Sequence, residues 1–207
     1  MSPLDVVDWR RRVHALYAQV RAVAGSADGP EAAHALWRAE RDALLGTHPA
    51  SPLLPEARRG FRGLPYGPYD AGMRFEVVLD DTVDPVPWEV PTGTDGVVPF
   101  ELAGVLHLPG LGDLDVWRLA SYGGGLFVPV KDAGAGRTTY GGGRYLLDTV
   151  KGADLGGDPA AGVLVVDLNF AYNPSCAYDP TWACPLAPAG NTLPVPLAAG
   201  ELAPPSQ

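Results

Sequence analysis

Glycine and proline recur along this chain so often that most of it must be built from short elements joined by turns. The 207 residues contain 26 glycines and 22 prolines, almost a quarter of the sequence, and they show no period. Proline interrupts helices and glycine permits tight turns, whereas collagen and low-complexity chains require a regular repeat or a biased tract. We therefore expect many short β-strands in a folded domain.

The first 47 residues differ from the rest and predict two helices. Ser2-Pro3-Leu4-Asp5 has the residues of a helix start, with a capping serine, a proline and an acid three residues after the cap. Apolar residues then recur every three or four positions up to Gly25, at Val6, Trp9, Val13, Leu16, Val20 and Val23. A second helix is expected from about Asp28 to Gly46. Residues 1–47 thus form a predicted helical arm, which must pack on the following chain or on a partner.

Residues 48–72 are predicted to be a wrapping connector with a helical turn near 55–60, and residues 73–207 a β-rich body within one structural unit. We expect strands at 74–79, 97–108, 113–121, 126–130, 144–147, 162–168 and 192–198. The second, third and fourth of these read as a meander. Prolines 129, 194 and 196 favour strand ends or edges. The predicted class is mainly β with N-terminal helices (α+β), as an antiparallel barrel or sandwich with two helices packed on it.

Charge and hydropathy exclude several kinds of partner. The net charge of −9 disfavours nucleic acid, and the basic cluster at residues 10–12 lies on a predicted solvated helix face. The sequence has no apolar run of 18 residues, so we expect no membrane span. The first residues carry early acids and no apolar core of a secretory signal, so we expect a cytoplasmic protein.

The first candidate site is the turn Thr138-Thr-Tyr-Gly-Gly-Gly-Arg144-Tyr145. Backbone N–H groups of Gly142 and Gly143 could converge on one point beside the fork of Arg144, with Tyr140 as a wall, which suits a carboxylate or phosphate. The alternative is a tight turn whose arginine pairs with an internal acid such as Asp167.

The second candidate is the strand end that begins at Asp167. Alternation places Asp167 and Asn169 on one side of the strand, and Tyr172 and Asn173 follow in the loop. These side chains could face a pocket, while Asn173 before Pro174 could equally serve the turn itself.

The two cysteines leave several alternatives open. Cys176 and Cys184 are separated by seven residues, which fits neither a CxxC redox pair nor a zinc ribbon. They could be small buried thiols, a loop-closing or redox-responsive pair, metal ligands or a nucleophile. We expect no metal site, because the sequence has no second ligand pair.

Four motifs in this chain resemble the domain-of-unknown-function family 1684 of bacteria and archaea. They are YGGGRYL, DLNFAYNPSCAY, W-x-CPLAP-x-x-N-x-L and AAGE, preceded by Arg41-Asp42, HPASPL at 48–53 and Lys131-Asp132. The resemblance implies that the cysteines, the glycine turn and the Asn-containing loops belong to one shared framework, and it implies no particular reaction. Some relatives resemble exported lipoproteins, so the cysteines could tolerate an oxidising compartment, although we expect no such leader for this chain.

The combined expectation is a protein that binds a small anionic molecule in a β-barrel pocket. Its ligand-binding residues would be Tyr140, Gly142, Gly143, Arg144, Asp167, Asn169, Tyr172 and Asn173, and the hypothesis depends on Arg144 and Asp167 facing one hollow. One alternative is an enzyme that uses Asp167 or Glu201 in acid–base chemistry, or a flavin in a split barrel. Another is an assembly module without ligand that forms a homodimer through the stripe of the first helix.

Overall fold

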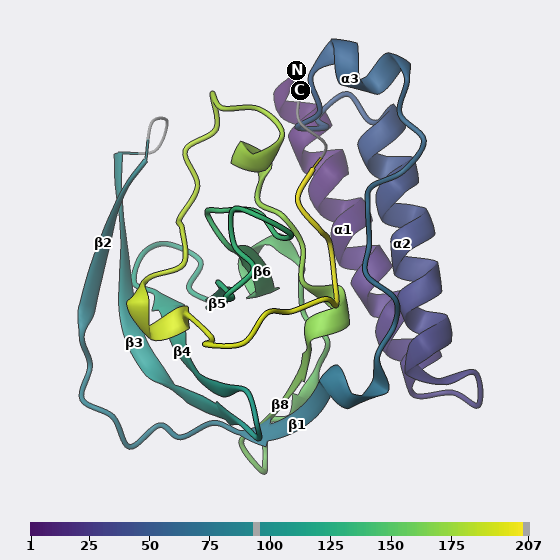
Figure 1. The fold of residues 1–207 in the computed structure, drawn as a ribbon. Coiled ribbons are helices and arrows are strands. Elements are labelled where there is room, and N and C mark those ends of the chain that lie inside the picture. The colour runs from purple at the N-terminus through teal and green to yellow at the C-terminus, as the bar shows by residue number, and fades with distance from the viewer. Residues whose placement is uncertain (93–95, 205–207) are drawn as a thin grey trace.

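Two N-terminal helices pack against one side of a β-rich body in this computed structural model (Figure 1). The structure describes residues 1–92 and 96–204. Helix α1 spans Pro3–Ala24 and begins with a capping box between Ser2 and Asp5, and α2 spans Gly29–Thr47. Both predicted helices are confirmed, as is the helical turn of the connector, α3, at Pro55–Arg59. No helix in the described ranges is long and apolar enough to cross a membrane.

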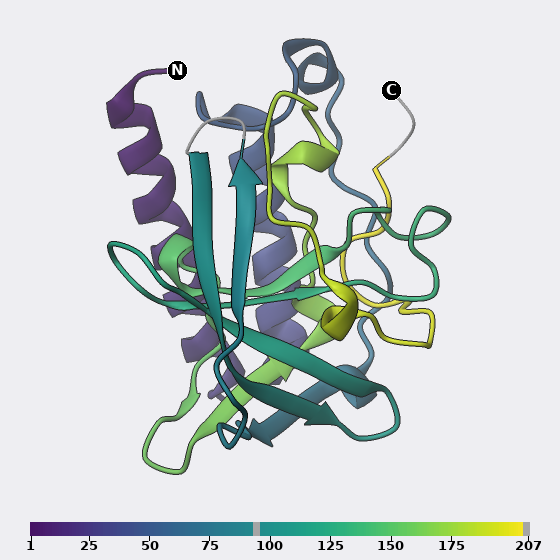
Figure 2. The same ribbon diagram turned by 90° about the vertical axis from the view of Figure 1, so that its left-hand side faces the viewer.

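The facing sides of α1 and α2 are buried against the body. Leu16, Tyr17 and Val20 of α1 and Trp37 of α2 share one apolar cluster with Phe170. A turn of Figure 1 by 90° shows the sheets in front and the helix pair behind (Figure 2). Much of the apolar stripe of α1 is thus covered within the chain itself.

The strands form two antiparallel sheets. In the five-stranded sheet, β2 (Pro87–Thr92), β3 (Gly96–Leu108), β4 (Gly112–Leu119), β5 (Leu126–Val130) and β6 (Arg144–Asp148) lie in sequence order. In the three-stranded sheet, β8 (Val163–Asp167) lies between β1 (Arg74–Val78) and β7 (Gly157–Asp158). The mainly antiparallel β class and the meander at 97–130 are confirmed. Strand β2 was not predicted, because it contains two prolines, which its edge position tolerates.

Short 3₁₀ turns connect these strands to the loops. They are η1 (Ala71–Met73), η2 (Thr149–Lys151), η3 (Leu168–Phe170), η4 (Ser175–Ala177) and η5 (Ala189–Asn191). Turns η2 and η4 contribute Lys151 and Ser175 to the lining of a cavity between the helix pair and the body.

The structure has no closed barrel within the residues that it describes, so the expected antiparallel barrel or sandwich is confirmed only as antiparallel sheets with two helices packed on them. Its two sheets do not close on each other, and residues 192–198, expected as a strand, make only a single bridge between Thr192 and Lys131. Pro194 and Pro196 lack the N–H groups that a ladder needs. The segment instead inserts Leu193 and Leu197 into the apolar core between the sheets.

Candidate functional site

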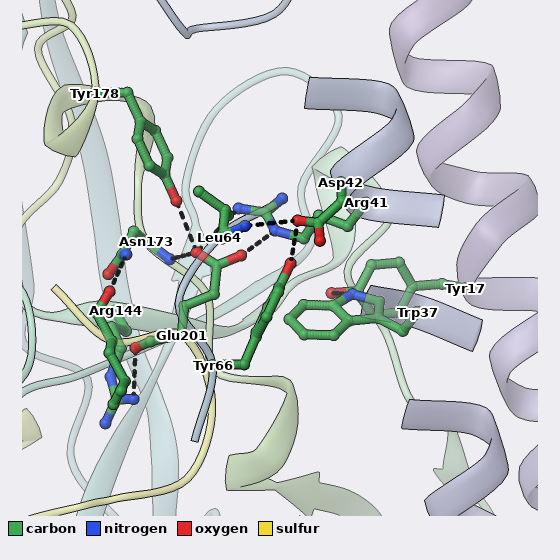
Figure 3. A network of polar contacts seen from close by, with 11 residues as sticks. Tyr17, Trp37, Arg41, Asp42, Leu64, Tyr66, Arg144, Asn173, Tyr178 and Glu201 are labelled. Atoms are coloured by element: carbon green, nitrogen blue, oxygen red, sulfur yellow. Dashed lines mark hydrogen bonds and ion pairs between the residues drawn. The ribbon is translucent and has the colours of Figure 1, made fainter. Parts of the chain in front are cut away.

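A buried carboxylate, that of Glu201, ties the helix pair to the C-terminal segment (Figure 3). Its side chain has no exposed surface, and it forms an ion pair with Nε and Nη2 of Arg41 from α2. The Tyr178 hydroxyl donates to Oε2 of Glu201 at 2.8 Å, and the backbone N–H of Asn173 donates to the same atom at 2.7 Å. Four donor groups therefore hold this carboxylate, as a buried charge requires.

The neighbouring residue of α2, Asp42, holds the connector. Its Oδ1 accepts hydrogen bonds from the backbone N–H of Leu64 at 3.1 Å and from the Tyr66 hydroxyl at 2.9 Å. The backbones of Tyr66 and Glu201 form an isolated antiparallel β-bridge. Arg41 and Asp42 thus bind two different segments from adjacent positions of one helix.

A cavity of about 100 Å³ lies beside Arg41, between the helix pair and the body. It is small compared with the 300–1,000 Å³ of typical ligand pockets, but large enough for a small polar group or several waters. Its polar and aromatic lining comprises Trp9, Tyr17, Arg41, Tyr145, Asp148, Lys151, Tyr172, Asn173, Ser175, Tyr178 and Cys184.

Several hydrogen-bonding groups of this lining are not used by the fold. Nη1 of Arg41 and the hydroxyl of Tyr172 have no partner among the described residues. Tyr17 accepts from Nε1 of Trp37 at 3.2 Å, so its own proton stays available. Oδ1 of Asn173 is buried without a partner in the same described ranges. These four groups therefore supply three donors and one amide acceptor to the cavity.

Burial keeps these hydroxyls protonated. Desolvation raises the pKa of Tyr172 and of Tyr17 well above the ordinary value, so both remain donors at neutral pH. The guanidinium carbon of Arg41 lies 4.8 Å from the ring centroid of Tyr172, which orients both groups toward each other.

The rim of the cavity carries an ion pair and a thiol. Nζ of Lys151 lies 3.3 Å from Oδ2 of Asp148, and Lys151 is half-exposed. Cys184 lines the cavity, and its thiol pKa is lowered to about 6, first by a hydrogen bond from the Cys176 thiol and further by Lys151. The same hydrogen bond raises the pKa of Cys176. Both cysteines are free and partly exposed, so they are present as two thiols and not as a disulfide.

A larger groove of about 420 Å³ adjoins the cavity over the five-stranded sheet. The two share Asp148 and Lys151, and Ala183 and Pro185 line the groove on either side of Cys184. The remaining lining of the groove is mostly apolar and consists of Val97, Val98, Pro99, Phe100, Leu119, Ser121, Gly125, Leu126, Phe127 and Val150.

Arg144 lines neither this cavity nor the groove, and its ion-pair partner is not Asp167 as expected. Its side chain is fully buried, with Nη2 3.1 Å from Oδ2 of Asp132 and Nη1 donating to the carbonyls of Ala199 (2.6 Å) and Glu201 (2.9 Å). Asp132 follows β5, which pairs with the β6 strand that begins at Arg144, so the sheet itself brings the two together. The internal-pair alternative is correct, with a different acid.

Asp167 and Asn169 close the turn η3 instead of lining the cavity. Oδ1 of Asp167 accepts from the backbone N–H (3.0 Å) and Nδ2 (2.7 Å) of Asn169. Asn169 also bonds in both directions to the backbone of Asp70, which fastens the end of the connector. Burial raises the pKa of Asp167 to about 6.

The glycine turn also lies outside the cavity lining. The Tyr140 hydroxyl donates to the carbonyl of Cys176 at 3.5 Å and approaches its sulfur at 3.6 Å. Gly143 has a φ of +86°, and a Cβ there would meet the Val130 carbonyl oxygen at 2.9 Å. The conformation and this close approach explain Gly143, while Gly142 packs against Tyr140.

Of the eight residues predicted to bind ligand, Tyr172 and Asn173 line the cavity. Arg41, Tyr17 and Lys151, which also line the cavity, were not predicted as site residues. A signal existed for Arg41: it lies four residues after Trp37 and four before Leu45, both buried, so it falls on the inward face of α2.

The fold and the site define a two-sheet β protein with a helix pair packed over a polar cavity. The chain belongs to the family described as "Protein of unknown function (DUF1684)", whose model matches residues 59–202, as the motifs predicted. It is similar to an uncharacterized protein of Haloarcula marismortui with a solution NMR structure, at 33% sequence identity and a TM-score of 0.57, over 80% of this chain and 89% of that one. No curated protein is significantly similar to the chain.

Proposed function

We propose that this protein binds a small anionic molecule in the cavity between the helix pair and β6. The observation that carries the proposal is the set of unused donors around the cavity: Nη1 of Arg41 and the hydroxyls of Tyr17 and Tyr172. Oxygen atoms of a carboxylate accept from such donors, and charge-assisted bonds from arginine are the strongest of them. The binding site is thus proposed at Arg41, in place of Arg144.

The enzymatic alternative has less support. Glu201 is held by four donor groups, and Asp167 does not line the cavity, so neither acid stands beside the proposed ligand. A flavin ring is also too large for a cavity of about 100 Å³. We therefore propose binding without assigning a reaction.

Isothermal titration of the purified full chain with benzoate, acetate and inorganic phosphate tests the proposal. Tyr172→Phe keeps the ring under Arg41 and removes one donor, so it should weaken binding of the anion about fivefold. Tyr122→Phe is the matched control, because Tyr122 is fully exposed and lines neither cavity nor groove. Absence of binding of all three anions at millimolar concentration, or equal affinities of the two variants, would overturn the proposal.

A further inference from the structure

A continuous row of aromatic rings leads from the open groove to the arginine in the cavity. Neighbouring ring centroids are 5.1 Å (Trp88–Phe100), 5.5 Å (Phe100–Phe127), 4.7 Å (Phe127–Tyr145) and 5.6 Å (Tyr145–Tyr172) apart. Tyr172, the last ring, lies beneath the guanidinium of Arg41. The row therefore ends at the unused donors described above.

The two ends of this row have opposite character. At the groove, Phe100, Leu119 and Phe127 present apolar surface with few polar groups. At the cavity, the lining is rich in donors. The groove and the cavity have Asp148 and Lys151 in common, so the two adjoin at these residues, the groove with a mainly apolar lining and the cavity with a polar one.

Volume also separates the two parts. The groove, at about 420 Å³, lies within the range of pockets that hold organic ligands, whereas the cavity, at about 100 Å³, suits a compact head group. A planar carboxylate is compact and accepts several hydrogen bonds at once. An apolar chain or ring would remove the groove surface from water.

We propose that the ligand is an amphipathic organic acid, with its carboxylate at Arg41, Tyr17 and Tyr172 and its apolar body along Phe127 and Phe100. This inference rests on the proposed function and names its ligand class. At the junction of groove and cavity, Lys151 forms an ion pair with Asp148 and its side chain is half-exposed.

Titration of the full chain with butanoate, hexanoate, octanoate and decanoate, all below their micelle concentrations, tests the proposal. Each added methylene should tighten binding about fourfold until the groove is filled. The fluorescence of Trp88 and Trp117, which belong to the same aromatic cluster, should change with the longer acids. 1-Octanol, which lacks the carboxylate, should bind at least tenfold more weakly than octanoate.

A pair of exposed valines supplies the variants. Val97 lines the groove and is 58% exposed, so Val97→Asp should fold and should weaken decanoate at least tenfold while leaving butanoate unchanged. Val78→Asp, at 61% exposure on β1 and outside the groove, is the matched control and should change neither.

The outcomes distinguish failure of the proposed ligand class from failure of the proposed anion-binding function. If short acids bind and Tyr172→Phe weakens them, but decanoate binds no tighter than butanoate or Val97→Asp has no effect, the amphipathic class is wrong and the anion site stands. If octanol binds as well as octanoate, the carboxylate assignment is wrong. If no acid of any length binds, both proposals fall.

Discussion

Arg41 of α2 and Glu201, which lies 160 residues later in the chain, form an ion pair that is almost closed to solvent. The Glu201 side chain is fully buried and that of Arg41 is 14% exposed. A pair in this setting stabilises the fold only while both charges are present, because either charge alone would remain desolvated.

Glu201→Gln should therefore lower the free energy of unfolding by about 3–5 kcal/mol, since it leaves the Arg41 guanidinium without a counter-charge. Urea unfolding followed by circular dichroism measures the change. Glu56→Gln is the control, because its pair with Arg59 lies on the surface and should contribute less than about 1 kcal/mol. Equal effects of the two variants would contradict the assigned role of the buried pair.

Asp132→Asn should destabilise the protein by a similar amount, about 3–5 kcal/mol, because the fully buried Arg144 loses the carboxylate with which it forms its ion pair. Asp81→Asn, at an exposed position, should have little effect. Folded Asp132→Asn should bind benzoate as the natural chain does, since neither Asp132 nor Arg144 lines the cavity. Selective loss of ligand affinity without loss of stability would restore Arg144 as a binding residue.

Asp167→Asn should stabilise the protein at neutral pH. The folded state raises the pKa of Asp167 from 3.8 to about 6, so the folded form binds this proton more tightly than the unfolded chain. The contribution of this group is most favourable below pH 4 and is lost as the pH rises to about 6, by about 3 kcal/mol in total. Asparagine does not ionise, and its side-chain oxygen can still accept from the Asn169 N–H.

Urea unfolding of the natural chain and of Asp167→Asn at pH 4, 5, 6 and 7 tests the direction of this pH-dependent change in stability. The two should agree near pH 4 and diverge as the pH rises, with the variant the more stable. If the free energy of unfolding of the variant instead fell below that of the natural chain as the pH rose from 4 to 7, Asp167 would be needed in its ionised form.

Cys184 should react with iodoacetamide before Cys176. Its pKa of about 6 makes it largely thiolate at pH 7, whereas the pKa of Cys176 is raised by the same thiol–thiol hydrogen bond. Peptide mass spectrometry over pH 5–9 should give a midpoint near 6 for Cys184. Cys176→Ala removes the donor and should move that midpoint upward; an unchanged midpoint would assign the shift to another cause.

Gly67→Ala should destabilise the fold by about 3 kcal/mol or more, because its Cβ would lie 1.6 Å from the carbonyl oxygen of Ala198. The backbone N–H of Gly67 also donates to Gly200 at 2.8 Å, so the connector and the C-terminal segment run in contact here. Gly60→Ala, where a Cβ meets nothing within 4 Å, is the control and should cost less than about 1 kcal/mol. Thermal unfolding of both variants measures the loss of stability.

Much of the secondary structure could be predicted because its signals are local. The capping box at Ser2 and Asp5, the periodic apolar stripe of α1 and the turns between β3, β4 and β5 each lie within a few residues of the element that they specify. Strand β2 was missed because prolines count against a strand unless it is known to be an edge. The segment 192–198 was wrongly predicted as a strand, because its alternating apolar residues fill the core while the segment forms only one β-bridge, between Thr192 and Lys131.

The candidate site was predicted only in part. Tyr172 and Asn173 were found because polar and aromatic residues after a buried strand mark a loop near a pocket. Arg144 was predicted as a site residue, but its partner Asp132 was not identified, and Glu201 was considered only as an acid–base residue although it is fully buried in an ion pair.

Local patterns in the amino acids were sufficient for the helix starts, most of the strand positions and the β-rich class. They act through backbone dihedrals and nearest-neighbour burial, which depend on residues close in the chain. Only the assembled molecule decided which acid pairs with each arginine, Asp132 with Arg144 and Glu201 with Arg41. It also decided where the cavity between the helix pair and the body lies. Ion pairing depends on which charges are desolvated together, and residues 160 positions apart meet only after the helices dock on the sheets.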